Sequence, residues 1–353
     1  MRVALMTEYS MVGGGESNLL SLAGELDKSV KVTLFCHGIV KDRAEERGLD
    51  VVEFKTEKRW YRSIPLPVFD RELVGKLNSF DIVHAYSVNI LPLLFFVKSK
   101  KVWTNHGYWE RPFGLRAFMI DKIVDRVICV STDVNNSAEF EESKKRVIFL
   151  GTDFKIDKGR GGGFNKESVE IVCVGRFQRI KGQDLLIDAL KELSKTVSGR
   201  ITVRFVGDVN ANTPEDLEFK NELLEKAQRA GSENLSILFE GFRSDVEKYM
   251  GAADLVVIPS RYESFGMVAI EALACGKPIV APDIGGIRDI VDSEKVGLLF
   301  EAGNVADLKK KIEYAICNYD SFSRAASLKR AGKFTIGEQA EKHIRLYREL
   351  LNG

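Results

Sequence analysis

Short, continuous apolar runs recur along the chain, and they limit its possible folds more than any other feature. In the first half these runs lie at residues 2–7, 30–36, 51–54, 81–86, 101–104 and 126–131. Runs without polar alternation are typical of strands covered on both faces, as in a parallel sheet. Stretches that predict helices separate them, at residues 16–26, 42–48, 70–79, 90–99 and 113–124.

The second half repeats this alternation. Its predicted strands are residues 170–174, 201–206, 235–239, 255–258, 278–281 and 296–300, and its predicted helices are 183–197, 214–231, 305–317 and 336–351. The glycine-dense stretch Lys158-Gly-Arg-Gly-Gly-Gly163 between the halves is typical of a linker. We therefore expect an α/β fold with two Rossmann-like, doubly wound domains that face a central cleft. The expected division is residues 1–157, a linker at 158–168, residues 169–334 and a final helix at 335–353.

Composition excludes several classes of function. The 353 residues carry a net charge of +1, so no bulk electrostatic attraction to nucleic acid is expected. The five cysteines lack metal-ligand or redox spacing, which fits a reducing compartment. The N-terminal apolar run is too short for a signal peptide, and the longest run, residues 90–97, is too short to span a membrane. We expect a cytoplasmic protein, at most peripheral at the inner face of the plasma membrane.

A basic stretch from Lys55 to Arg62 contains two aromatic residues and precedes Ser-Ile-Pro-Leu-Pro. A solvated loop explains this composition. Contact with an anionic membrane surface or with a charged acceptor explains it as well. The sequence leaves both interpretations open.

Two candidate site clusters follow strands of the first half. Gly13, Gly14 and Gly15 come after the opening strand and begin a helix, so their backbone N–H groups can approach a phosphate. A tight turn would need the same glycines, and the spacing fits neither a dinucleotide fingerprint nor a P-loop. His106 lies between Asn105 and a glycine at a strand end, which favours a site role, whereas His84 lies within an apolar strand and is expected in the core.

A third cluster follows the first strand of the second half. Arg176 and Lys181 lie on either side of the turn in Gly175-Arg-Phe-Gln-Arg-Ile-Lys-Gly182. A guanidinium fork and an ammonium point charge together suit a diphosphate. Two solvated charges are the plainer alternative, but cations near a helix N-terminus oppose its dipole, and a bound anion would explain their placement better.

The fourth cluster lies within residues 259–286. Glu263 occupies a polar turn, and Ser264, Phe265, Gly266, Met267 and Val268 lead into a helix whose N–H groups suit an anion. From Met267 to Cys275 every residue is apolar except Glu271. A lone carboxylate on such a helix needs a partner, which could be a ligand hydroxyl, a solvated groove or an arginine from another segment.

Together these motifs resemble the retaining glycosyltransferases of the GT-B fold, family four (glycosyl transferases group 1). The resemblance covers nearly the whole chain and is strongest from Ile171 to Phe300. It rests on the Arg176–Lys181 turn, on Gly241-Phe-Arg, on Glu263 and Glu271 with seven residues between them, on Gly285-Gly286 and on Val296-Gly-Leu-Leu. It implies a transferase that moves a sugar from a nucleotide-diphosphate sugar, UDP-linked or GDP-linked, to a hydroxyl of a glycan or lipid-linked acceptor.

The resemblance also implies roles for single residues. Arg176 and Lys181 would hold the donor diphosphate, Glu263 the sugar hydroxyls and Glu271 the ribose hydroxyls. Gly14 would approach the diphosphate, and His106 would lie beside the sugar. Such enzymes usually need no metal or other cofactor, they transfer with same-face attack, and their last helix crosses back onto the N-terminal domain.

One departure from the family pattern concerns the nucleotide. The family often has Val-Gly-x-Gly after the second strand of this domain, whereas the sequence here is Val206-Gly-Asp-Val-Asn210. The identity of the base therefore stays open between UDP and GDP. Two alternatives to transfer also stay open: a sugar-nucleotide epimerase of the same fold, and a non-catalytic nucleotide-sugar-binding protein.

Overall fold

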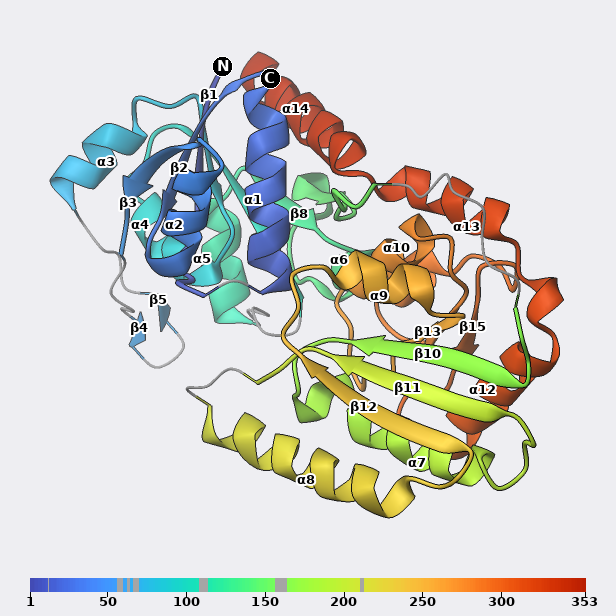
Figure 1. Ribbon diagram of the computed structural model, residues 1–353. Helices are drawn as coiled ribbons and strands as arrows, with labels where there is room; N and C mark the ends of the chain where they lie inside the picture. Colours follow the sequence, from blue (N-terminus) through green and yellow to red (C-terminus); the bar gives the residue numbers. More distant parts are fainter. Residues whose placement is uncertain are drawn as a thin grey trace. The chain divides into compact units, whose positions relative to one another are not determined.

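The computed structural model describes residues 1–11, 13–55, 60–61, 64–65, 70–107, 114–155, 164–209 and 213–353. The chain forms two compact units (Figure 1). The first unit is Met1–Asp153 together with Phe334–Gly353, and the second is Phe154–Lys333. Most of the segment from Lys55 to Arg62, the glycine-dense stretch 158–163 and Asn210 lie outside the described residues.

The first unit contains a seven-stranded parallel sheet in the order β3-β2-β1-β6-β7-β8-β9. Its strands are β1 (Arg2–Met6), β2 (Lys31–Cys36), β3 (Asp50–Glu53), β6 (Ile82–Ala85), β7 (Lys100–Asn105), β8 (Arg126–Cys129) and β9 (Lys145–Val147). Two short strands, β4 (Trp60–Tyr61) and β5 (Ile64–Pro65), form a separate antiparallel pair. The predicted parallel sheet is confirmed, and β9 is an edge strand that the sequence did not indicate.

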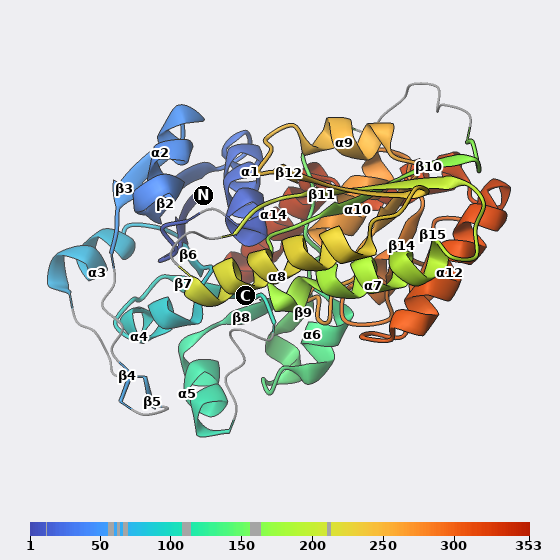
Figure 2. The same ribbon diagram turned by 60° about the horizontal axis from the view of Figure 1, so that its bottom comes forward.

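Helices cover both faces of this sheet (Figure 2). They are α1 (Gly14–Asp27), α2 (Gly38–Glu46), α3 (Arg71–Leu77), α4 (Leu91–Leu94), α5 (Leu115–Ile123), α6 (Thr132–Ser137) and α14 (Ile336–Asn352), with 3-10 turns η1 (Val88–Ile90) and η3 (Glu142–Lys144). Helix α2 begins four residues before its predicted start because Val40 and Ala44, one turn apart, both pack into the core. Helix α4 is much shorter than the predicted segment 90–99.

Helix α14 belongs to the first unit although it is the last element of the chain. It packs along α1, and its apolar residues Ala340, Leu346 and Leu350 join the core that α1 and α2 form with the sheet. Polar contacts add to this packing. The Asn18 amide of α1 donates to the Gln339 side chain at 2.8 Å, and Gln339 accepts the Gly151 N–H at 2.7 Å.

The second unit contains a six-stranded parallel sheet in the order β12-β11-β10-β13-β14-β15. The strands are β10 (Ser168–Val174), β11 (Arg200–Val206), β12 (Leu235–Gly241), β13 (Leu255–Val257), β14 (Ile279–Pro282) and β15 (Gly297–Phe300). Its helices are α7 (Gln183–Leu193), α8 (Pro214–Ala230), α9 (Val246–Ala252), α10 (Met267–Ala274), α11 (Ile287–Ile290), α12 (Val305–Cys317) and α13 (Arg324–Ala331), with turns η4 (Arg179–Lys181), η5 (Tyr319–Ser321) and η6 (Gly332–Phe334).

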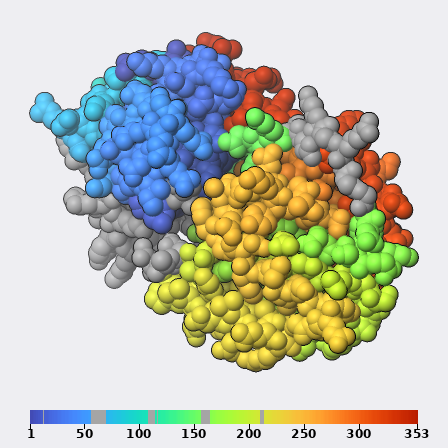
Figure 3. All heavy atoms as spheres, viewed as in Figure 1, coloured from blue at the N-terminus to red at the C-terminus, as the bar shows by residue number. Residues whose placement is uncertain are grey.

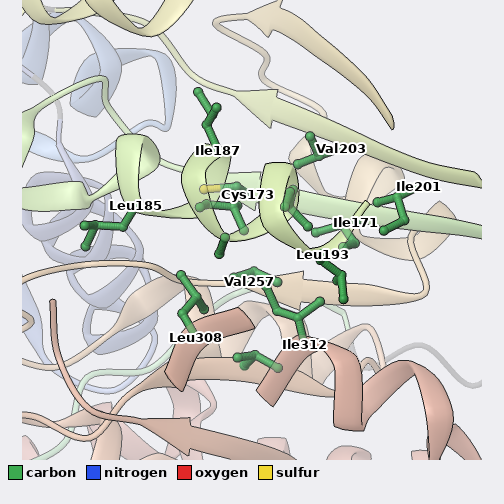
Figure 4. Close-up of a cluster of buried hydrophobic side chains, with 14 of the residues drawn as sticks. Ile171, Cys173, Leu185, Ile187, Leu193, Ile201, Val203, Val257, Leu308 and Ile312 are labelled. Carbon is green, nitrogen blue, oxygen red and sulfur yellow. The ribbon is translucent and has the colours of Figure 1, made fainter. Parts of the chain in front are cut away.

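The core of the second unit is built by α7, α8 and α12 against one face of the sheet. Figure 4 shows side chains of β10, such as Ile171 and Cys173, in one cluster with Ile187 of α7 and Ile312 of α12. Helix α8 lies on the surface of this unit (Figure 3) and buries only a stripe with three- and four-residue spacing. None of the described helices is both long and apolar enough to cross a membrane.

Candidate active site

The strand order of the second sheet reverses beside β10. The chain runs from β10 outward to β11 and β12, and then returns to place β13 on the other side of β10. In doubly wound sheets ligands bind at such a switch point, beyond the carboxyl ends of the strands. The two loops that leave this point are residues 175–182, after β10, and residues 258–266, after β13.

These two loops are in direct contact. A Cβ at Gly182 would lie 2.0 Å from the carbonyl oxygen of Pro259, and Gly182 has a φ of +67°, so only glycine fits there without strain. The Arg261 N–H donates to the Ile180 carbonyl oxygen at 2.8 Å. The Arg261 guanidinium also makes two hydrogen bonds, of 2.8 and 2.7 Å, to the carboxylate of Asp184. This bracing pair was not found from the sequence, where Arg261 and Asp184 are 77 positions apart.

Lys181 and Glu263 meet where the loops touch. The Lys181 ammonium donates to Oε1 of Glu263 at 2.6 Å, and the hydroxyl of buried Ser260 donates to the same oxygen at 2.8 Å. The two side chains are 27% and 12% exposed, so the pair is partly shielded but open to a ligand. The sequence assigned the cation and the carboxylate to different parts of a donor, and the structure shows that they contact each other directly.

Arg176 lies at the start of the same loop and is exposed. Within the described part of the chain its guanidinium makes no hydrogen bond or ion pair. Its backbone is fixed, because the side chain of buried Gln183 donates to the Arg176 carbonyl oxygen at 2.8 Å. A cation held near a helix N-terminus without an acidic partner suits an anionic ligand.

Glycines make room for the segment from Glu263 to Phe265. A Cβ at Gly285 would lie 1.7 Å from the Glu263 carbonyl oxygen, and one at Gly286 would lie 2.5 Å from the Phe265 Cα. Helix α10 begins directly afterwards, with Gly266 at a φ of +110° as its N-cap. Phe265 is buried, whereas Ser264, Met267 and Val268 are half-buried. In the first turn of α10 the Ala269 N–H donates to the Gly266 carbonyl oxygen at 2.9 Å. The N–H groups of Met267 and Val268, which precede it, suit an anion.

Glu271 is the fifth residue of α10. It is half-buried and shares a stripe of the helix with Met267 and Val268, whereas Ala269, Ile270 and Ala272 are buried. The carboxylate therefore does not lie inside the core, although its helix is otherwise apolar. The structure places it in the second turn of α10, on the less buried side of the helix.

In the first unit, the glycine cluster and His106 lie near each other. A Cβ at Gly15, in the first turn of α1, would lie 4.0 Å from Cε1 of His106. The Gly13 N–H donates to the Glu16 carboxylate at 2.9 Å, so one N–H of the predicted phosphate cradle already has an acceptor. The N–H groups of Gly14 and Gly15 form the remaining glycine part of that cradle.

His106 follows β7 at the carboxyl end of the first sheet. Its ring packs at 5.7 Å, between ring centroids, against the ring of Tyr86, which follows the neighbouring strand β6. Burial lowers the pKa of His106 to about 4, so the imidazole is neutral near pH 7. Gly107, at a φ of +97°, turns the chain directly after it. His84 lies in the core, as its apolar strand indicates.

Each unit thus carries one group of the predicted residues. The second unit brings Lys181 into contact with Glu263, places Arg176 on the Lys181 loop and starts α10 directly after the Glu263 loop. The first unit brings the glycine turn at Gly13–Gly15 close to His106. Among the described residues, no three His, Cys, Asp or Glu side chains are arranged to hold a metal ion.

Family models match both units. The model of the glycosyl transferases group 1 matches residues 155–333, and that of glycosyltransferase family 4 matches residues 12–154. The chain therefore belongs to the group 1 glycosyltransferases. Its two parallel α/β units are those of the GT-B fold.

Relatives and solved structures agree with this family. Over 293 residues the chain is 29% identical to the lipopolysaccharide core biosynthesis mannosyltransferase LpsB of Rhizobium meliloti, covering 75% of this chain and 78% of LpsB. It is 34% identical over 197 residues to an uncharacterized glycosyltransferase of Methanocaldococcus jannaschii, where the match covers 55% of this chain and only 50% of the relative. The crystal structure of Anabaena HepE with UDP has a TM-score of 0.82 at 23% identity, covering 99% of this chain and all of that one.

Proposed function

We propose that the chain is a retaining glycosyltransferase that moves a sugar from a nucleotide-diphosphate sugar to a hydroxyl of a glycan or glycolipid. A UDP-sugar is the favoured donor, and no metal is required. The observation that carries this proposal is the contact between Lys181 and Glu263 at the switch point of the second sheet, with the exposed cation of Arg176 on the Lys181 loop. Structures of the same fold hold UDP and UDP-glucose in HepE, and LpsB acts in lipopolysaccharide core biosynthesis.

The residues of the second unit suit each part of such a donor. Arg176 and Lys181 supply positive charge to the diphosphate, and the N–H groups at the start of α10 supply further donors. Glu263 accepts hydrogen bonds from the sugar hydroxyls and stabilises positive charge that develops on the sugar ring. Glu271, on the less buried side of α10, accepts the ribose hydroxyls. Because Lys181 donates to Glu263 at 2.6 Å, it also fixes the orientation of that carboxylate.

The first unit supplies neutral groups. The N–H groups of Gly14 and Gly15 approach the diphosphate, and the uncharged His106 imidazole lies beside the sugar. In the reaction the bond between the anomeric carbon and the phosphate oxygen breaks, and the acceptor oxygen forms its bond on the same face of the ring. The proton of the acceptor hydroxyl passes to the departing phosphate, so no protein nucleophile is needed.

Two arginines of one loop provide a matched test of the donor site. Arg176→Ala should weaken UDP binding by about 2–5 kcal/mol if the charge contacts phosphate. Arg179 lies three positions away, is 62% exposed and pairs with Glu222, so Arg179→Ala should change UDP affinity by less than about 1 kcal/mol. Calorimetric titration with UDP and GDP measures both. Equal affinities in the two variants would exclude the diphosphate role of Arg176.

A thermal-shift panel of UDP-, GDP- and ADP-sugars identifies the nucleotide. Product analysis with and without acceptor then separates transfer from epimerisation, because an epimerase changes the donor without any acceptor. Turnover that Glu263→Ala abolishes would exclude a non-catalytic binding protein.

A further inference from the structure

Four aromatic rings form a continuous column inside the first unit. It starts on α14 with His343, whose ring centroid lies 5.6 Å from that of His84 on β6. The His84 ring lies 4.7 Å from that of Tyr86, and the Tyr86 ring lies 5.7 Å from that of His106. The column therefore connects the C-terminal helix to the histidine that follows β7.

Two hydrogen bonds hold the central ring of this column in place. Nδ1 of His84 is 2.6 Å from the Tyr347 hydroxyl of α14, and Nε2 is 2.7 Å from the Thr104 hydroxyl of β7. All three side chains are at most 1% exposed. A neutral imidazole donates from one nitrogen and accepts at the other, so one hydroxyl must donate to the ring and the other must accept from it. The plane of the His84 ring is fixed from both sides.

The base of the column is fixed as well. Nδ1 of His343 is 2.8 Å from the carbonyl oxygen of Gln339, one turn earlier in α14. The Gln339 side chain in turn bonds to Asn18 of α1 and to the Gly151 N–H. Asn18 is one turn beyond Gly14 in α1. Helix α14 thus has contacts that lead to both parts of the first-unit site, the glycine turn and His106.

Packing alone does not explain this arrangement. An apolar side chain at position 84 would fill a buried site without the cost of burying two ring nitrogens. The histidine is satisfied only because two elements distant in sequence each supply a hydroxyl. The end of the column, His106, lies between the Tyr86 ring and the first turn of α1. A fixed column therefore limits how the His106 ring can tilt.

We propose that the column of His343, His84 and Tyr86 positions the His106 imidazole for sugar transfer, with Tyr347 and Thr104 as its anchoring residues. The C-terminal helix α14 then contributes to the first-unit site, because it carries His343 and Tyr347. This inference rests on the proposed function, because it assigns His106 to the reacting sugar. Tyr347 and Thr104 are positioning residues, since they act through His84.

Two near-isosteric variants test the anchors, Tyr347→Phe and Thr104→Val. Each removes one hydroxyl from His84 and leaves the side-chain shape almost unchanged. The protein has four histidines, so their imidazole resonances can be resolved by NMR with labelled histidine. We expect both variants to shift the His106 resonance, because each frees the His84 ring that supports the column. We also expect kcat for sugar transfer to fall about tenfold, with donor KM changed less than about twofold, because the donor charges lie on the second unit.

Tyr319→Phe is the matched control. It also removes one tyrosine hydroxyl, which donates to the Asp254 carbonyl oxygen at 3.1 Å in the second unit. The control should leave the His106 resonance and kcat unchanged. An unmoved His106 resonance in both anchor variants, or a shift without a fall in kcat, would overturn the inference. If the wild-type protein transfers no sugar, the proposed function fails, and the NMR shift alone then decides whether the column holds His106.

Discussion

The carboxyl edges of the two sheets are built from different chemistry. In the second unit the edge carries charges that remain partly exposed: Arg176, and Lys181 with Glu263. In the first unit it carries glycine N–H groups and a neutral ring, His106, that leads inward to a buried column. Exposed charges are inexpensive to maintain and can stabilise a departing phosphate. A half-buried neutral ring contributes position rather than charge. The proposed function assigns stabilisation of the leaving group to the charges and placement of the sugar to the neutral ring.

Removal of the Lys181 charge should have the largest effect. Lys181→Ala should lower the stabilisation of the transition state by about 2–5 kcal/mol. The departing phosphate would lose the ammonium charge beside it, and Glu263 would lose its cationic partner. Lys226→Ala is the matched control, since Lys226 pairs with Asp188 at the same 2.6 Å but lies on the outer helices. Steady-state kinetics measure both. Similar activity of the two variants would show that the Lys181 charge, at the carboxyl edge of the second sheet, does not contribute to turnover.

A glycine substitution should have the next largest effect. Gly285→Ala places a Cβ 1.7 Å from the Glu263 carbonyl oxygen at a φ of +50°, so the Glu263 loop must move. We expect it to weaken donor binding by about 3 kcal/mol. Gly303→Ala carries the same kind of backbone strain, at a φ of +80°, but its Cβ would meet nothing within 4 Å. Calorimetry should therefore find a change in binding only for Gly285→Ala.

Acid should destabilise the first unit through its buried rings. Burial lowers the pKa of His343 from 6.5 to about 4, and burial together with the neighbouring histidines holds the pKa of His84 well below its usual value. Between pH 6.5 and about 4 the unfolded chain protonates its histidines, whereas folded His343 stays neutral. The free energy of unfolding therefore falls as the pH drops through this interval. For His343 the loss at pH 5 is about 2 kcal/mol.

Denaturant titrations from pH 7 to pH 4.5 measure this slope. His343→Phe keeps an aromatic ring in the column and removes its proton uptake, so its slope should be shallower than that of the wild type. An identical slope in both proteins would show that His343 does not contribute to the acid sensitivity.

The sequence predicted the parts of the molecule that depend on local periodicity. Continuous apolar runs located most of the parallel strands, and the spacing of Arg176, Lys181, Glu263 and Glu271 pointed to the family. Element limits were less accurate. Strand β9 is short and at the edge, and its burial is slight, so it left no distinct apolar run. The early start of α2 depends on Val40 packing into the core, which is a tertiary contact.

By itself, the sequence determined two βα arrays and residue types that suit a phosphorylated, hydroxyl-rich ligand. Only the tertiary structure decided which of those residues meet. Lys181 and Glu263 are 82 positions apart, and His84 and Tyr347 are 263 apart. The spacing of residues along the chain reports which face of a helix or strand they share. Contacts over such separations depend instead on the order of parallel strands and on the docking of α14 against α1, which no local pattern encodes.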